Sequence, residues 1–152
     1  MSIIKSILTN HFALKITRNW DKTYWGFDIH GTILKPNYTY GDTPSEFYPL
    51  AKETLQIISK LPDIVMILYT CSHPHEIDEY IKLFEENDIH FNHINENPEV
   101  LTDKKGYGCY DKKPYFNVLF EDKAGFDPDN DWGLVYSLLT TNYGENKGFT
   151  NL

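Results

Sequence analysis

A short apolar stretch that ends in a carboxylate and a glycine turn constrains this chain more than any other feature. Residues 24–29 combine aromatic and β-branched side chains, which predicts a buried strand. Asp28 falls at the end of this strand, and Gly31 lets the chain turn sharply behind it because glycine has no Cβ to restrict φ. In open α/β sheets, ligands bind at the carboxyl ends of the strands. The stretch therefore predicts that Asp28 is a nucleophile or a metal ligand.

Three further strands are predicted downstream. Residues 64–69 are continuously apolar, a pattern typical of a strand that is covered on both faces in a parallel sheet, and Thr70 follows them. Weaker strands are expected over 89–94 and over 115–120, the last of which ends at Glu121 and Asp122. Candidate site residues are thus predicted at the ends of three of these strands: Asp28, Thr70, and the pair Glu121 and Asp122.

Proline positions and the helical spacing of apolar residues predict the remaining elements. One helix is expected from position 43, where Thr-Pro-Ser-Glu has the form of a capping box, or from Pro49, which lacks an amide. Another begins at Pro74, and a last helix carries Trp132 and Leu139. We also expect a short helix over 2–10, an extended segment over 13–17, loops over 33–42, 95–113 and 125–131, and a tail over 142–152.

The alternation of strands and helices predicts the fold class. It indicates a parallel three-layer α/β sandwich with a Rossmann-like sheet, in which residues 1–152 form a single domain. Residues 1–20 are expected to pack on that domain as an N-terminal element. The segments between the predicted strands are too short to hold a separate cap domain, so the cleft at the sheet edge should be open.

Charge and cysteine content exclude several functional classes. The chain has 14 Lys and Arg against 22 Asp and Glu, and this net charge of −8 argues against a general nucleic-acid binder. Two cysteines do not form a disulfide framework, and no apolar run approaches the roughly 20 residues needed to span a bilayer. We therefore expect a cytoplasmic protein without a membrane partner. Cys71 is interpreted as a small buried residue, and the four histidines at 73, 75, 90 and 93 lack the spacing of known zinc sites.

The order of these features resembles the haloacid dehalogenase-like superfamily, and in particular its small capless phosphatases. That family shows an hhhhDxDGT motif, then a strand ending in Thr or Ser, then a Lys, then a strand ending in acidic residues. The matching segments here are 25–32, 67–70, Lys113 with Pro114, and 119–124. Each motif by itself is weak, whereas the four in order are specific.

The resemblance implies a Mg²⁺-dependent phosphohydrolase that acts on a phosphate monoester. Asp28 would be the nucleophile that forms an aspartyl-phosphate, Thr70 would donate its hydroxyl to a phosphoryl oxygen, and Lys113 would add a positive charge, with Lys112 as the competing lysine. The implied ligands of Mg²⁺ are Asp28, the backbone carbonyl of His30 and Asp122, supported by Glu121 or by Asp127.

His30 departs from the family motif, which has an aspartate at this position that serves as the acid and base. A histidine can replace that aspartate, since imidazole transfers protons near neutral pH. It can instead mark a substrate whose leaving group needs no proton, or a degenerate member that binds a phosphate or another ligand and turns over poorly. Carbon–halogen hydrolysis, which needs no Mg²⁺, is a weaker alternative because of the pair Glu121 and Asp122.

An open cleft would admit several kinds of partner. These are a small phosphorylated molecule or an exposed phosphate on a macromolecule, and a polynucleotide end is the one nucleic-acid partner that stays open. The loops over 33–42 and 95–111 are expected to flank the entrance. Their tyrosines would either stack on a substrate ring or pack: Tyr38, Tyr40, Tyr107 and Tyr110.

Overall fold

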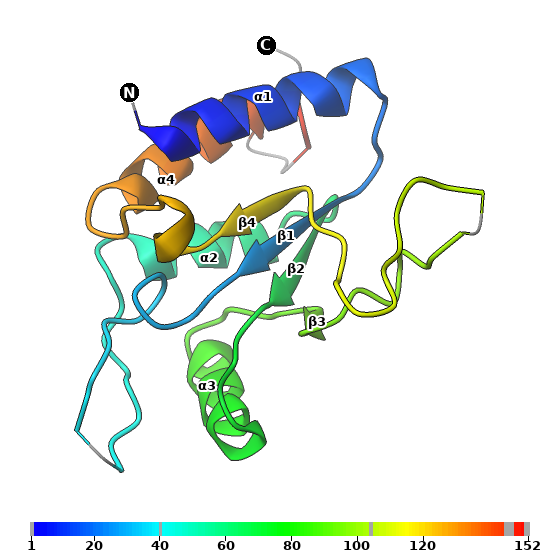
Figure 1. The fold of residues 1–152 in the computed structure, drawn as a ribbon. Helices are drawn as coiled ribbons and strands as arrows, with labels where there is room; N and C mark the ends of the chain where they lie inside the picture. The colour runs from blue at the N-terminus through cyan, green and yellow to red at the C-terminus, as the bar shows by residue number, and fades with distance from the viewer. Residues whose placement is uncertain (1, 40, 104, 145–147, 151–152) are drawn as a thin grey trace.

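A four-stranded parallel sheet forms the centre of the computed structural model, which describes residues 2–39, 41–103, 105–144 and 148–150 (Figure 1). The strands lie in the order β3-β2-β1-β4. Their bounds are Thr23–Phe27 for β1, Ile64–Leu68 for β2, His93–Ile94 for β3 and Val118–Phe120 for β4. With its flanking helices this is an α/β Rossmann-like fold, as the alternating pattern of the sequence predicts.

The register of the sheet aligns the ends of three strands. Phe27 pairs with Leu68 on one side and with Phe120 on the other. The ladder continues one residue further, because the Asp28 amide donates to the Phe120 carbonyl at 3.0 Å and the Tyr69 amide donates to the Phe27 carbonyl at 2.8 Å. The residues that follow β1, β2 and β4 therefore emerge at the same edge.

Helices α1 (Ile3–Thr17), α2 (Ala51–Ser59), α3 (Pro74–Glu86) and α4 (Asp131–Asn142) share one hydrophobic core with one face of the sheet. Figure 1 shows α1 lying along α4. At the centre of this core, Phe27 stacks on Phe120 with ring centroids 4.7 Å apart, and Phe120 stacks on Trp132 at 5.6 Å. This aromatic stack fixes the ends of β1 and β4 relative to each other, because Phe27 and Phe120 are the last residues of those strands.

The opposite face of the sheet is covered by the connection between β3 and β4, which contains no helix in its described residues. Phe116 lies over Gly26, where a Cβ would come within 2.8 Å of the phenyl ring, and Tyr115 packs edge-on against Tyr24. Val65 and Ile67 are buried on this face although they are not part of the helix-side core. A loop thus forms the third layer of the sandwich.

Several element boundaries differ from the prediction. The segment 13–17 is not extended, because α1 runs without interruption to Thr17, and its buried stripe includes the polar residues His11 and Lys15. No helix begins at the capping-box sequence of position 43; α2 starts at Ala51, after Leu50 in the left-handed region with φ 62°. Strand β3 keeps only two of the residues expected over 89–94.

The end of the chain is not a free tail in its described part. Tyr143 is buried, its hydroxyl donates to Asp63 Oδ2 at 2.8 Å, and Phe149 stacks on Phe12 of α1 at 5.6 Å. Residues 145–147 and 151–152 of the predicted tail lie outside the described residues. In the part of the chain that the structure describes, no helix is long and apolar enough to cross a bilayer.

Candidate active site

The turn after β1 is stabilised by several amides that donate to one backbone carbonyl. The Ile29 carbonyl accepts the amides of Thr32, Ile33 and Leu34 at 2.9 to 3.2 Å. Gly31 has φ 74°, and a Cβ at this position would lie 2.8 Å from Asp122 Oδ2. Glycine is therefore required both by the backbone conformation and by the close approach of the carboxylate from β4.

Thr32 ties the two strand ends together from the buried side of the turn. Its Oγ1 accepts the Asp122 amide at 3.2 Å and lies 3.4 Å from both Asp28 Oδ2 and Asp122 Oδ1, so its single proton is shared between the two carboxylates. Its carbonyl accepts the indole N–H of Trp132 at 2.8 Å. The turn is thus anchored to α4 as well as to β4.

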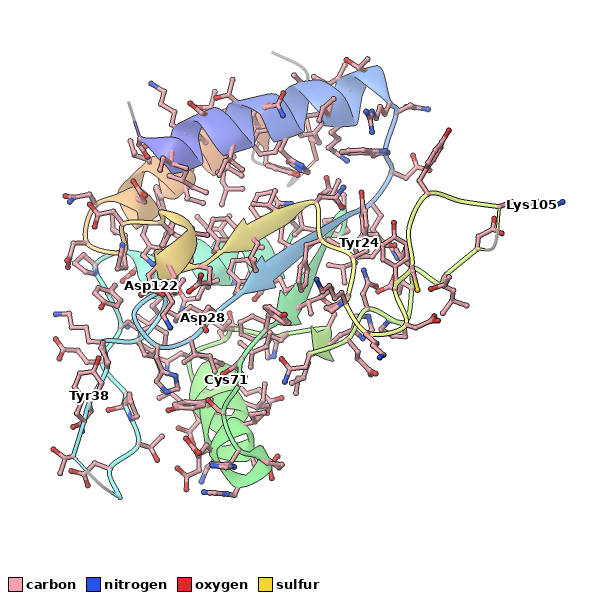
Figure 2. The ribbon with its side chains drawn as sticks, viewed as in Figure 1. Tyr24, Asp28, Tyr38, Cys71, Lys105 and Asp122 are labelled. Carbon is pink, nitrogen blue, oxygen red and sulfur yellow. The ribbon has the colours of Figure 1, made fainter. Side chains whose placement is uncertain are left out.

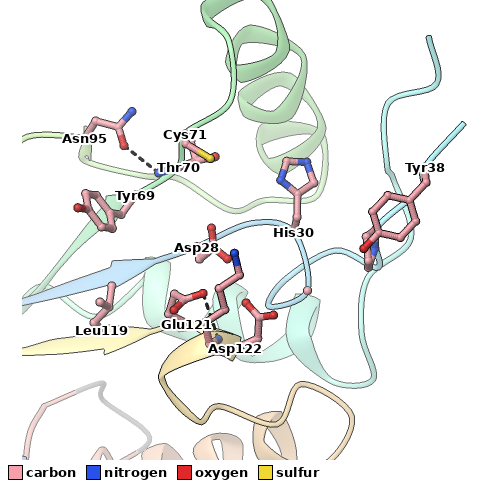
Figure 3. A pocket seen from close by; sticks show the side chains of 13 residues that line it. Asp28, His30, Tyr38, Tyr69, Thr70, Cys71, Asn95, Leu119, Glu121 and Asp122 are labelled. Atoms are coloured by element: carbon pink, nitrogen blue, oxygen red, sulfur yellow. Dashed lines mark hydrogen bonds between the residues drawn. The ribbon is translucent and has the colours of Figure 1, made fainter. Parts of the chain in front are cut away.

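Three carboxylates converge at this edge. One oxygen each of Asp28, Glu121 and Asp122 lies within 4.8 Å of the others. Figure 2 shows Asp28 and Asp122 side by side at the strand ends, and Figure 3 shows all three side chains directed toward one another. Residues that are more than 90 positions apart in the chain form one cluster, and its oxygen-only donor set is the kind that hard divalent cations prefer.

The electrostatics of the cluster favour a cation. Burial raises the pKa of Asp28, the Ile29 amide opposes this, and the neighbouring charge of Asp122 raises it further. Burial also raises the pKa of Glu121, with a further contribution from Asp122. Both shifts show that negative charge is unfavourable here without a counter-ion. A bound divalent cation would relieve this repulsion.

The carboxylates form one wall of a cavity of about 630 Å³, and Thr70 and Asn95 belong to the lining. The Asn95 side chain accepts the Thr70 amide at 2.8 Å, so β3 and β2 are joined at their ends (Figure 3). The Thr70 hydroxyl lies 2.9 Å from the Ser72 hydroxyl. Cys71, expected to be buried, is instead exposed and also lines this cavity. It lies on the chain that leaves the sheet edge, so no layer covers it.

His30 also lines the cavity, and its ring is turned toward α3 (Figure 3). Its Nε2 atom makes a 2.6 Å hydrogen bond with the hydroxyl of Tyr80, a fully buried residue of α3. Burial raises the pKa of Tyr80 to about 12, so this hydroxyl keeps its proton at neutral pH. The residue that departs from the family motif is therefore held by a specific partner.

Three candidate residues from the resemblance lie elsewhere. Lys113 and Lys112 are exposed in the loop before β4 and do not line the cavity, whereas Lys123 does. Asp127 is outside the carboxylate cluster; its side chain accepts the Asp129 amide and the Asn130 side-chain amide in the turn before α4. Asp127 thus orders the turn that precedes α4, whose N-cap residue is Asn130.

Of the described tyrosines that were expected to flank the entrance, one lines the cavity and two do not. Tyr38 lines the cavity, whereas Tyr107 is fully exposed outside it and Tyr110 packs on Tyr115 at 5.5 Å. Tyr40 lies outside the described residues.

Asn95 and Lys123 line the cavity although neither was predicted to be a site residue. Asn95 directly follows β3, and its φ of 56° is a conformation that asparagine tolerates well. The rule that singled out Asp28 and Thr70, a polar residue directly after a strand, applies equally to Asn95. Lys123 directly follows the acidic pair in the sequence, and this position could have indicated that it lies at the site.

The fold and the site define an α/β Rossmann-like protein with a carboxylate cluster at the carboxyl edge of its parallel sheet. The chain is similar in structure to a conserved protein coded by a locus of Bacteroides thetaiotaomicron, with a TM-score of 0.58 and 20% sequence identity over 86% of this chain and 99% of that one. This likeness concerns the fold alone. No family model matches the chain. No curated protein matches it either.

Proposed function

We propose that the protein is a Mg²⁺-dependent phosphohydrolase that cleaves a phosphate monoester through an aspartyl-phosphate on Asp28. The convergence of Asp28, Glu121 and Asp122 at one sheet edge is the observation that carries this proposal. The resemblance of the four motifs to haloacid dehalogenase-like phosphatases supports it. Mg²⁺ held by Asp28, Asp122 and the His30 carbonyl, with Glu121 in support, would neutralise phosphoryl oxygens and orient the ester.

The reaction proceeds in two displacements. An oxygen of Asp28 attacks phosphorus, the bond to the alcohol oxygen breaks, and that oxygen takes up a proton. A water molecule then attacks the aspartyl-phosphate, loses a proton and releases inorganic phosphate, which restores the Asp28 carboxylate. Thr70 and Lys123 line the same cavity and would contact phosphoryl oxygens, so Lys123 takes the charge-balancing role that the resemblance assigned to Lys113.

His30 would give and take the proton in these two steps. It lines the cavity that holds Asp28, and its Nε2 is hydrogen bonded to Tyr80, which orients the ring. A fixed imidazole orientation is the usual requirement for acid–base work by histidine.

The turn of His30 toward α3 also favours a second candidate, a binding protein for a phosphate ester that it does not hydrolyse. The substitution His30→Asp separates the two functions. A gain of activity would favour the degenerate binding protein, and a loss would show that His30 takes part in turnover.

Phosphate release from an aryl phosphate and from a panel of phosphate monoesters tests the proposal. We expect turnover with Mg²⁺, no turnover in EDTA, and a loss on the order of 1,000-fold or more in Asp28→Asn. Asp78→Asn is the matched control, because Asp78 is exposed on α3 and does not line the cavity that holds the carboxylates. Turnover that persists in EDTA or in Asp28→Asn would contradict the proposal.

A further inference from the structure

A second cavity, of about 570 Å³, lies between Asn37 with residues 41–44 on one side and the first two turns of α3 on the other. We call it the α3 cavity. His30 and Tyr80 belong to its lining, and the other side chains that line it are polar or acidic apart from Pro44: Asn37, Asp42, Thr43, His73, His75, Glu76 and Glu79. Its volume is within the range of about 300–1,000 Å³ that is typical of small-molecule sites.

His30 connects this cavity to the site described above, because it lines both. The carboxylates lie on one side of His30 and α3 on the other (Figure 3). An ester whose phosphoryl group is held at Asp28 therefore has the α3 cavity on the far side of the His30 ring. The two cavities adjoin at His30, so an ester whose phosphoryl group is held at the sheet edge would place its alcohol beside α3.

The lining of the α3 cavity is rich in hydrogen-bond acceptors. It contains three carboxylates, and none of its described lining residues is Lys or Arg. Glu76 contributes to the start of α3, where it accepts the His73 amide, and Glu79 accepts the Thr43 hydroxyl, which joins the loop to the helix. His73 and His75 stack in parallel with their ring centroids 5.8 Å apart and add further donors and acceptors.

We infer that the α3 cavity receives the alcohol part of the substrate, and that this alcohol carries hydroxyl groups and an ammonium group, as an amino sugar does. The inference rests on the proposed function. Hydroxyl and ammonium groups supply the donors that carboxylates and imidazoles accept. A second phosphate, by contrast, would meet three carboxylates without a basic partner, and like-charge contacts of this kind are strongly unfavourable.

Three esters of one sugar skeleton test the inference. They are glucosamine phosphate and glucose phosphate, both esterified on the terminal hydroxymethyl group, and glucose bisphosphate. We expect kcat/KM to fall by about tenfold from the amine to the neutral sugar, and by at least about tenfold more to the bisphosphate. Equal values for the amine and the neutral sugar, or a preference for the bisphosphate, would overturn the inference.

The variant Glu79→Lys places a cation in the cavity, and Glu86→Lys is its matched control on the exposed end of the same helix. Glu79→Lys should abolish the preference for the amine and raise the relative activity on the bisphosphate, whereas Glu86→Lys should leave the ratios unchanged. The milder Glu79→Gln should reduce the preference without reversing it. Unaltered ratios in both Glu79 variants would overturn the assignment of the cavity.

A failure of the proposed function can be recognised separately. If neither the aryl phosphate nor any sugar phosphate is hydrolysed, the phosphohydrolase proposal fails, and binding of the two monophosphates is measured by calorimetry instead. Tighter binding of glucosamine phosphate that is lost in Glu79→Lys still supports the α3 cavity as its subsite. Equal affinity for the two sugars, or no binding of either, overturns the inference.

Discussion

At the scale of single residues, the site depends on small groups that bring like charges together. Thr32 is fully buried, and its hydroxyl contacts the side chains of both Asp28 and Asp122 while accepting the Asp122 amide. Gly31 provides the space into which Asp122 projects. Neither residue belongs to the carboxylate cluster, yet both determine the distance between its members.

Thr32→Val removes the shared hydroxyl and keeps the shape of the side chain. We expect a loss of about 10- to 100-fold in Mg²⁺ affinity, because partners of metal ligands typically contribute that much. The unpaired Asp122 amide should also lower the free energy of unfolding by about 1–3 kcal/mol. Calorimetric titration and urea unfolding measure the two effects, with the exposed Thr17→Val as control. Unchanged Mg²⁺ affinity would contradict this role.

Gly31→Ala places a methyl group against the Asp122 carboxylate. The left-handed conformation at φ 74° costs alanine about 1 kcal/mol, and the 2.8 Å contact with Oδ2 forces Asp122 to move. We expect lower thermal stability together with weaker Mg²⁺ binding. Gly41→Ala is the control, since Gly41 also has a positive φ but has nothing within 4 Å of the added Cβ. Equal Mg²⁺ affinity in the two variants would show that the close approach is unimportant.

Protons should compete with the cation at this site. Burial raises the pKa of Asp28 and of Glu121, and both must lose their protons to bind a metal. Apparent Mg²⁺ affinity should therefore fall as the pH is lowered through these raised pKa values, at a higher pH than ordinary carboxylates would require. Titrations between neutral and mildly acidic pH measure this, and an affinity that does not change with pH would contradict the expectation.

At the scale of elements, two buried polar residues hold α1 in place on the sheet. His11 of α1 is buried among Phe12, Trp20 and Trp25, with the Trp25 indole N–H 3.4 Å from its Nε2. Lys15 is buried one turn further on, donates to the Trp20 carbonyl at 2.8 Å and lies 3.2 Å from Asp63 Oδ2. These contacts explain why α1 continues through a segment whose sequence resembles an extended one.

His11 should make the folded state sensitive to acid. Burial, and then the charge of Lys15, lower the pKa of His11 from 6.5 to about 4, while Asp63 raises it. The unfolded chain binds a proton at His11 at a higher pH than the folded protein does. The contribution of neutral His11 to the free energy of unfolding is therefore complete above pH 6.5 and is lost as the pH falls toward 4. The loss is on the order of 3 kcal/mol.

Urea unfolding of the protein and of His11→Gln across this range measures the contribution. The difference between the two pH profiles isolates His11 from the carboxylates that titrate in the same window. Parallel profiles would show that His11 is not the source of any acid sensitivity.

Gly26 should control the packing of the loop that covers the second face. A Cβ at position 26 would lie 2.8 Å from the Phe116 ring and 3.1 Å from the Leu119 side chain. Gly26→Val should displace the loop and lower the free energy of unfolding by about 1–3 kcal/mol, as overpacking usually does. Limited proteolysis should cut this variant faster between β3 and β4. Gly106→Val, in the exposed part of the same loop, is the control, and equal cleavage rates would contradict the interpretation.

At the scale of the whole molecule, strand order determines the site. β1 and β4 are neighbours in the sheet although β2 and β3 lie between them in the chain, and this adjacency brings the residues after Phe27 and Phe120 together. Lys105, in the connection between β3 and β4, lies on the opposite side of the molecule from Asp28 (Figure 2). The position of Lys113 could not be predicted from its neighbour Pro114, because a loop of this length has no periodic pattern that directs its side chains.

The amino-acid pattern alone determined the strands that bear the site and the carboxylates at their ends, because apolar runs and the polar residues that stop them are local features of the chain. Asp28, Thr70 and the pair Glu121 and Asp122 were predictable for that reason. Only the tertiary structure decided that Lys123 rather than Lys113 lines the cavity, that His30 is held by Tyr80, and that a loop covers the second face. Such choices depend on contacts between segments far apart in sequence, whose energies no local pattern contains.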